Sequence, residues 1–206
     1  MTGPLRISMP ADFDRLLLDA VTERFLPTHP GIRLEINMND RRVDMIREGF
    51  DMALRVGRVA DTGLIAKPLG MLSMVLVASP DYIARRGAPA TVAALENHDH
   101  IRYMLAGRPF PIHFLDAEYI PCTGVFDTDS GEALRIAARN GLGIAHILQA
   151  SVENDLAAGR LERVLPEISL TAAPVQVPHA FARAMPARAR ALTSFLAGDI
   201  ATYSLG

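Results

Sequence analysis

The fold is decided by residues 4–57, PLRISMPADFDRLLLDAVTERFLPTHPGIRLEINMNDRRVDMIREGFDMALRVG. Residues 32–38 alternate apolar and polar side chains, which is the period of a half-buried strand. Residues 12–25 place apolar side chains three and four positions apart, which predicts a helix that Asp12 caps and that Pro27 and Pro30 end. With strands near residues 5–8 and 52–56 and a short helix before Gly49, the order is strand, helix, strand, helix, strand. That order predicts a parallel sheet covered by helices.

The same alternation continues along the chain, so we expect an α/β protein of two lobes. Strands are predicted at 64–69 and 72–78, with Gly70 between them, and the chain then builds a second set of β/α units. We expect lobe I to hold residues 1–72 and 179–206, and lobe II to hold residues 73–178. The further elements predicted are helices at 80–84, 91–95, 130–139, 152–158 and 187–197, and strands at 101–104, 112–115, 124–127, 143–148 and 175–181.

The composition fits a globular protein with an ample core. Half of the 206 residues are hydrophobic, and the formal net charge of −2 gives no field that would attract nucleic acid. Cys122 is the only cysteine, which excludes an intrachain disulfide. No apolar run approaches the ~18 residues of a membrane span, and no signal peptide is recognisable. We therefore expect a cytoplasmic protein without a membrane partner, although a secreted protein that had lost its signal would look the same.

Several phrases, in order along nearly the whole chain, resemble the LysR-type transcription regulators. Asp51, Ala53, Arg55 and Gly57 form a D-x-A-x-R-x-G strand similar to one in that family. SGEALRIAARNGLGIA (130–145) and PARARALTSFLAG (186–198) are similar to its later helix and strand and to its closing helix. Three features depart from the pattern: Asp14 stands where glycine is frequent, the chain has no tryptophan, and no proline follows the strand at 143–148.

The resemblance implies the effector-binding domain of such a regulator. Its fold would be of the periplasmic-binding-protein type 2, with two Rossmann-like lobes joined by two crossing strands, and a small-molecule effector in the cleft between them. It implies a homodimer or tetramer, with the helix that starts at Asp12 near the partner's helix that starts at Ser130. The family's winged helix–turn–helix is not found before Gly3, so DNA would be bound only through that missing domain. The effector would change the geometry of the dimer or tetramer and so control transcription.

Candidate effector contacts follow from where parallel strands end and helices begin, because free backbone N–H groups and helix dipoles meet there. A small carboxylate suits such edges, but Asp127 and Asp129 would repel it, so a partly apolar or amine-bearing effector stays open. Ordinary roles compete: helix caps for Ser8 and Thr128, and a core position for His146. The candidates are Ser8, Met9, Pro10, Val56 and Gly57 in lobe I, and Thr128, Asp129 and His146 in lobe II.

Other functions have less support in the sequence. His98 and His100 flank Asp99 without the spacing of a zinc site, so we expect no metal and no cofactor. No nucleophile elbow, phosphate loop or acid/base pair is present, so we expect no catalytic residue and no enzyme. Arg55 in a strand is expected to pair with Asp51 or Asp40. The alternative to a regulator is the solute-binding protein of a transporter, which has the same fold.

Overall fold

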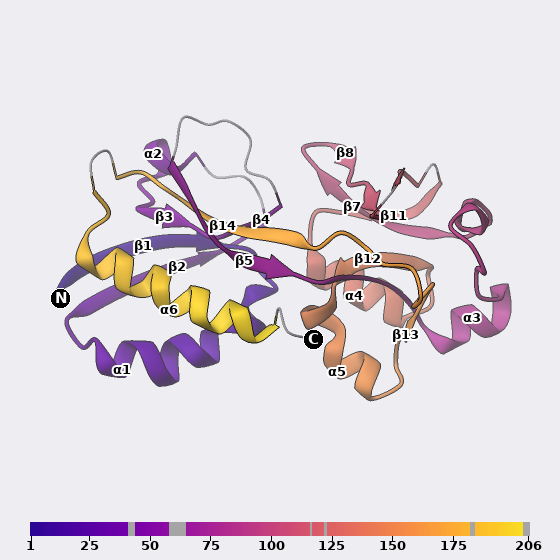
Figure 1. The fold of residues 1–206 in the computed structure, drawn as a ribbon, viewed down its shortest axis with the longest axis horizontal. Coiled ribbons are helices and arrows are strands. Elements are labelled where there is room, and N and C mark those ends of the chain that lie inside the picture. Colours follow the sequence, from indigo (N-terminus) through magenta and orange to yellow (C-terminus); the bar gives the residue numbers. More distant parts are fainter. Residues whose placement is uncertain (41–43, 58–64, 116, 122, 182–183, 204–206) are drawn as a thin grey trace. The chain divides into compact units, whose positions relative to one another are not determined.

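The computed structural model describes residues 1–40, 44–57, 65–115, 117–121, 123–181 and 184–203, and Cys122 lies outside this set (Figure 1). The chain forms two compact units: unit 1 is Met1–Leu72 with Ala173–Gly206, and unit 2 is Ser73–Ala172. The chain therefore returns to unit 1 at Ala173, earlier than the boundary at 178/179 expected from the sequence. The reason is that the strand at 173–179 pairs over its length with strands of unit 1.

Unit 1 is built on a six-stranded mixed sheet. Its order is β2-β1-β3-β14-β4, and β5 also pairs with β14. β1 runs parallel to β2 and to β3, whereas β14 is antiparallel to all its partners. The strands are β1 (Gly3–Met9), β2 (Ile32–Met38), β3 (Met52–Ala53), β4 (Arg55–Val56), β5 (Ile65–Leu72) and β14 (Ala173–His179).

Two strand predictions in this unit were wrong. The strand expected over residues 52–56 is split at Leu54 into β3 and β4. Leu54 N–H donates to the Ser8 carbonyl at 2.8 Å, while its own carbonyl accepts from the Arg55 guanidinium at 2.7 Å. β5 continues through Gly70, and the break before β6 falls at Ser73, because pairing with β14 extends to Leu72.

The helices of unit 1 include one that runs from residue 13 to residue 28 and contains wide, π-type turns. It ends at Thr28, between Pro27 and Pro30 as predicted, and Thr28 Oγ1 donates to the carbonyls of Arg24 and Phe25 in its last turn. Its segments are η1 (Asp14–Leu18), η2 (Val21–Phe25) and α1 (Leu26–Thr28). The short helix α2 (Met45–Glu48) ends at Gly49, which has a left-handed backbone conformation. The last helix, α6 (Ala187–Tyr203), packs on β5.

Unit 2 contains a second six-stranded mixed sheet. Its order is β11-β7-β12-β6-β13, with β8 added beside β7, and β11, β7 and β12 are mutually parallel. β9 and β10 form a separate hairpin. The strands are β6 (Met74–Ala78), β7 (His100–Leu105), β8 (Arg108–Pro109), β9 (Ile112–His113), β10 (Glu118–Tyr119), β11 (Gly124–Thr128), β12 (Ile144–Leu148) and β13 (Glu162–Arg163).

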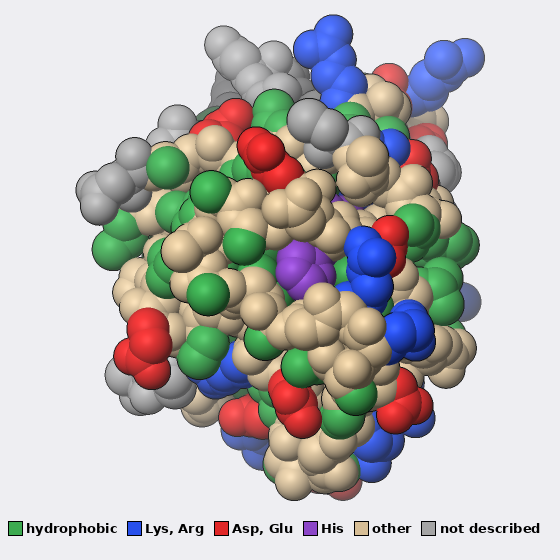
Figure 2. All heavy atoms as spheres, turned by 90° about the vertical axis from the view of Figure 1, so that its right-hand side faces the viewer, with side chains coloured by type: hydrophobic (Ala, Val, Ile, Leu, Met, Phe, Trp, Pro, Cys, Tyr) green, Lys and Arg blue, Asp and Glu red, His purple; other side chains and the backbone are tan. Residues whose placement is uncertain are grey.

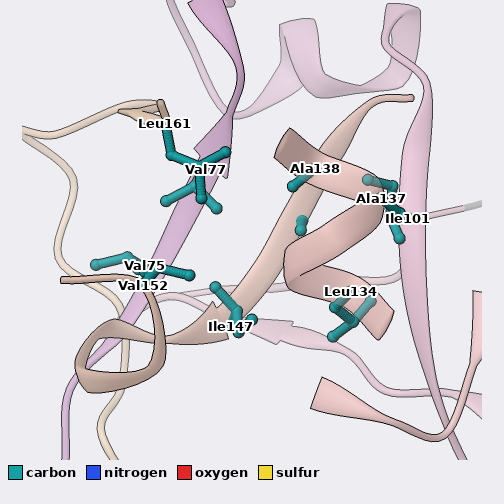
Figure 3. Packing of buried hydrophobic residues seen from close by; sticks show 10 residues of the cluster. Val75, Val77, Ile101, Leu134, Ala137, Ala138, Ile147, Val152 and Leu161 are labelled. Atoms are coloured by element: carbon teal, nitrogen blue, oxygen red, sulfur yellow. The ribbon is translucent and has the colours of Figure 1, made fainter. Parts of the chain in front are cut away.

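Each face of this second sheet carries its own hydrophobic cluster. One cluster joins α4 to the strands, and in Figure 3 Ala137 of α4 lies beside Ile101 of β7. The other joins Leu76 and Ile144 of the sheet to Tyr82, Leu95 and Ile112. The helices are α3 (Pro80–Arg86), η3 (Ala93–Asn97), α4 (Gly131–Arg139) and α5 (Gln149–Ala157). Within the described part of the chain, no helix has the length and apolar character to cross a bilayer.

A buried carboxylate fixes α4 to α5. Asp155, only 2 % exposed, accepts from Arg135 Nη1 at 2.5 Å and from Arg160 Nε at 2.6 Å. Arg135 also bonds Glu132 with two nitrogens, at 2.7 and 2.8 Å. The buried charges are therefore paired, and α4 is held rigidly against the next helix.

We expect Asp155→Leu to lower the free energy of unfolding by about 3–5 kcal/mol, because it leaves the buried Arg135 charge only partly compensated. Urea unfolding measures this. Glu153→Gln, an exposed change on the same helix, is the control and should shift stability by no more than about 0.5 kcal/mol. Equal effects of the two changes would contradict the assigned role of Asp155.

Candidate functional site

The carboxyl end of β1 places Ser8 and Met9 in unit 1. Ser8 is fully buried and Met9 is 1 % exposed. Ser8 Oγ accepts a hydrogen bond from Arg55 Nη2 at 3.0 Å. The serine hydroxyl can therefore still donate its own proton, and the arginine holds its oxygen in place.

The helix that follows Pro10 has fewer free amides than expected. Ala11 N–H donates to Asp40 Oδ1 at 2.9 Å, and Arg15 N–H donates to Asp14 Oδ1. Phe13 N–H donates to the Pro10 carbonyl at 3.2 Å. Two of these amides are already bound to the protein's own carboxylates, which weakens the argument for an anionic effector at this edge.

Val56 and Gly57 follow the split in the third strand. Val56 pairs antiparallel with Val175, and Gly57 N–H donates to the Pro174 carbonyl at 2.8 Å. Gly57 has φ +85°, and a Cβ placed there would meet no atom within 4 Å. At Gly57, then, glycine is required by the backbone conformation, and the space beside it is open.

In unit 2, Thr128 and Asp129 lie between β11 and α4. Thr128 Oγ1 accepts from Ser130 N–H at 3.1 Å, and Ser130 Oγ accepts from Ala133 N–H at 3.3 Å. Ser130 therefore caps α4, Thr128 bonds the backbone just before the helix, and Asp129 is exposed. Thr128 keeps a hydroxyl proton that it can donate.

Asp127, expected to repel an anion, is neutralised. Arg102 of the neighbouring strand donates Nε and Nη2 to its two carboxylate oxygens, each at 2.8 Å. These bonds hold the pKa of Asp127 below its ordinary value. The charge of Asp127 is therefore paired with that of Arg102.

His146 lies in the middle of β12, two strands away from Thr128. Its Nε2 is buried and has no hydrogen-bond partner, and its ring lies nearly parallel to that of Phe110, with the centroids 6.2 Å apart. Burial, with a smaller contribution from the charge of His113, lowers the pKa of His146 to about 4. The imidazole is therefore neutral at physiological pH.

Sequence reasoning missed three residues at these edges. Asn39 follows β2, its N–H donates to the Met9 carbonyl at 2.9 Å, and its Oδ1 is buried without a partner. The other two are Arg102, which bonds Asp127, and Phe110, whose ring lies against that of His146. Arg102 faces Asp127 only because β7 and β11 are neighbours in register, and no local pattern in the sequence signals that pairing.

The histidines weighed as metal ligands have protein partners. His98 Nδ1 lies 3.1 Å from the Tyr82 hydroxyl, and His100 Nε2 lies 2.8 Å from the Leu95 carbonyl. Burial lowers the pKa of both. The described residues contain no group of three side chains able to hold a metal ion. Arg55 donates to Ser8 and Leu54, while Asp51 and Asp40 accept from the Arg6 and Ala11 amides.

These features define a class of protein. Two mixed α/β units are joined by two chain crossings, and each unit presents hydroxyl-bearing side chains at the carboxyl ends of parallel strands. That is the arrangement of a ligand-binding α/β domain of two lobes.

Comparison with known proteins gives the family. Residues 1–200 match the model of the LysR substrate binding domain, and the chain belongs to that family. The HTH-type transcriptional regulator YhjC of Escherichia coli is 34% identical over 98% of this chain and 70% of its own length. CrgA of Neisseria meningitidis, another HTH-type regulator, is 32% identical over 80% of this chain, which spans 56% of that protein.

The fold has a close solved counterpart. The regulatory domain of Neisseria meningitidis CrgA, a LysR-type transcriptional regulator, superimposes with a TM-score of 0.82 at 26% identity, covering 97% of this chain and 99% of that one. The predicted fold class, a two-lobed α/β domain of the periplasmic-binding-protein type 2, is confirmed. So is the prediction that the chain is the effector-binding domain of a LysR-family regulator, and the relatives give no support to a transporter's solute-binding protein.

The buried His146 predicts a loss of stability in acid. The unfolded chain protonates this imidazole near its ordinary pKa of 6.5, whereas the folded protein resists protonation down to about 4. As the pH falls from 7 to 4, the unfolded state therefore binds more protons, and the free energy of unfolding should fall by about 3 kcal/mol from this group. His146→Phe should remove that part of the pH dependence in urea unfolding curves.

Ile147→Val, at the next position of β12, is the control. It should cost about 0.5–1.5 kcal/mol at every pH, because it removes a buried methyl group and no titrating group. If His146→Phe had the same pH dependence as the parent protein, the imidazole would not be buried in its neutral form.

Proposed function

We propose that this chain senses a small molecule through the polar strand ends of both units, with contacts from Ser8, Met9, Pro10, Val56, Gly57, Thr128, Asp129 and His146. An effector that touches both units would favour one separation between them. A differential binding free energy of about 1–3 kcal/mol is enough for a useful shift in population. The chain then acts by binding alone, without catalysis or a cofactor, in a cytoplasmic regulator.

The observation that carries this proposal is the Ser8–Arg55 pair. Ligand binding by Ser8 is supported by its buried hydroxyl with a donatable proton, which Arg55 holds at the end of a parallel strand and which caps no helix. Arg55 bonds both the hydroxyl and, at 3.4 Å, the carbonyl of Ser8. Thr128 supplies the comparable hydroxyl in unit 2.

We expect the output to pass through a DNA-binding domain outside this chain. The relatives are HTH-type regulators of greater length. On the face drawn in Figure 2, acidic and basic side chains are both present, in line with a net charge of −2. With that net charge, we expect the chain itself to have no broad positive field for contacts with phosphate groups.

Ser8→Ala should weaken the binding of the effector about tenfold, because a hydrogen bond in a buried site contributes about 1–1.5 kcal/mol. Native mass spectrometry of the protein from cells, followed by thermal-shift screening of metabolites, identifies the ligand, and calorimetry measures the change. Ser79→Ala, a buried serine that caps α3, is the control and should leave affinity unchanged. Undiminished binding in both Ser8→Ala and Thr128→Val would mean that the site lies elsewhere.

We further propose that the domain forms a homodimer or tetramer through the helix at residues 13–28 and α4. Ile136 of α4 is 46% exposed, and Val125 and Phe126 of the adjacent edge strand β11 are 51% and 38% exposed. Such neighbouring apolar side chains gain stability when a second copy covers them.

Ile136→Glu should shift the domain toward monomer, because a charge is costly to bury in an apolar contact. Light scattering across a concentration series measures this. Ile46→Glu, which replaces a 76% exposed isoleucine on α2, is the matched control and should leave the assembly intact. A domain that stays monomeric at high concentration without either change would contradict the proposed assembly.

A further inference from the structure

The ring of Phe110 covers a histidine of the sheet in unit 2. It lies nearly parallel to the His146 ring, with 13° between the planes and 6.2 Å between the centroids. Two other rings, those of His113 and Tyr103, meet Phe110 edge-on, at 5.8 and 6.5 Å. The space enclosed beside His146 is about 10 Å³, which holds about one water molecule. Phe110 therefore has to move before more water can reach the imidazole.

The chain that carries Phe110 is lightly attached to the sheet. β8 pairs with β7 over two residues only, and one of them, Pro109, has no N–H to donate. The Phe110 N–H donates to the Tyr103 carbonyl at 2.7 Å. Ala106, in the turn before β8, has φ +53°, a left-handed conformation that disfavours alanine. Phe110 belongs to neither hydrophobic cluster of unit 2, whereas Ile112 belongs to one and is 2 % exposed. The segment Arg108–Phe110, which we name the aromatic cover, can therefore lift without unpacking the core.

The charges around His146 oppose a proton on its ring. Asp127 is held by Arg102, and Glu118 Oε2 lies 3.2 Å from His113 Nδ1. The acids of the neighbouring strands thus already have basic partners, and an imidazolium would lie among other cations. The titratable side chains on the strands around His146 are His100, Arg102 and Tyr103 of β7, Arg108 of β8, His113 of β9, Glu118 and Tyr119 of β10, and Asp127 of β11.

Acid therefore favours the form in which the cover is lifted. With the cover closed, burial and, to a smaller extent, the charge of His113 lower the pKa of His146 from 6.5 to about 4. Lifting the cover hydrates the ring and returns its pKa toward 6.5, so the open form binds a proton more readily. From these two pKa values, the ratio of open to closed protein rises about a hundredfold as the pH falls from 7 to 4.

We propose that the aromatic cover is an acid-sensitive device, which protonation of His146 releases from the sheet while the rest of unit 2 stays folded. The open form exposes the Phe110 ring and the sheet around His146 to solvent. The device goes beyond the proposed function, because it lies within unit 2 and needs no effector.

Native-state hydrogen exchange of the whole 206-residue chain tests the proposal. The exchange rate of each amide is compared with that of an unstructured peptide at the same pH, which gives a protection factor. The Phe110 amide should lose about a hundredfold of its protection between pH 7 and pH 4. Low concentrations of urea should leave its exchange unchanged, because lifting the cover exposes little surface. The amide of Ile144, which donates to the Asp99 carbonyl at 2.8 Å in the buried part of the sheet, should respond to urea.

Two variants separate the histidines that contact Phe110. His146→Phe removes the titrating group beneath the cover, so the protection of the Phe110 amide should be the same at pH 7 and pH 4. His113→Gln, which removes the other imidazole against Phe110, is the control and should keep the loss of protection in acid. Should a variant fail to fold, ¹H–¹⁵N NMR of the His146 ring in the unaltered protein gives the same information, since its titration should accompany the loss of protection at Phe110.

Three results would overturn the proposal. The first is equal protection of the Phe110 amide at pH 7 and pH 4. The second is a dependence on urea as steep as that of Ile144, which would mean that Phe110 exchanges only when the whole domain unfolds. The third is a full loss of protection in acid that persists in His146→Phe, or that occurs in the unaltered protein without titration of the His146 ring.

Discussion

The two-unit fold depends on the pairing of β5 with β14. These are the strands by which the chain leaves unit 1 and returns to it, and they pair antiparallel from Ile65–His179 to Leu72–Ala173. Residues more than a hundred positions apart therefore meet in register, and in the sequence unit 2 is inserted between these two strands. The bulge at Val175/Gln176 lets β14 hold β4 and β5 at once. Backbone hydrogen bonds between β5 and β14 therefore hold together the two segments that connect unit 1 with unit 2.

Local patterns predicted those elements whose signals lie within a few residues. α4 is the clearest case, since Ser130 caps its start and Gly141, with φ +74°, follows its end. The alternation in residues 32–38 likewise became β2. Predictions failed where a distant partner decides the outcome: β5 continues through Gly70 because β14 pairs with it. The split at Leu54 depends on contacts with Ser8 and Arg55.

For the candidate site residues, the sequence predicted their places at strand ends but not their hydrogen bonds. Parallel strand ends and helix starts placed Ser8 and Thr128 correctly at polar edges. Whether amides there are free depends on side chains from other elements, such as Asp40, which takes the Ala11 amide. The same holds for Asp127, whose expected repulsion of an anion is cancelled by Arg102 from a strand 25 residues away. The two edges therefore change the case for a carboxylate effector in opposite directions: Asp40 occupies an amide that an anion would use in unit 1, and Arg102 removes the repulsion from Asp127 in unit 2.

Unit 2 shows two opposite ways of burying a polar side chain. Asp155 is surrounded by arginines that satisfy both its oxygens, so its burial is explained by the link between α4 and α5. His146, on the other face of the same sheet, has an apolar and aromatic surround and no partner for Nε2. The first arrangement contributes to a rigid scaffold, and the second makes the folded state less stable in acid, because burial opposes protonation of the imidazole.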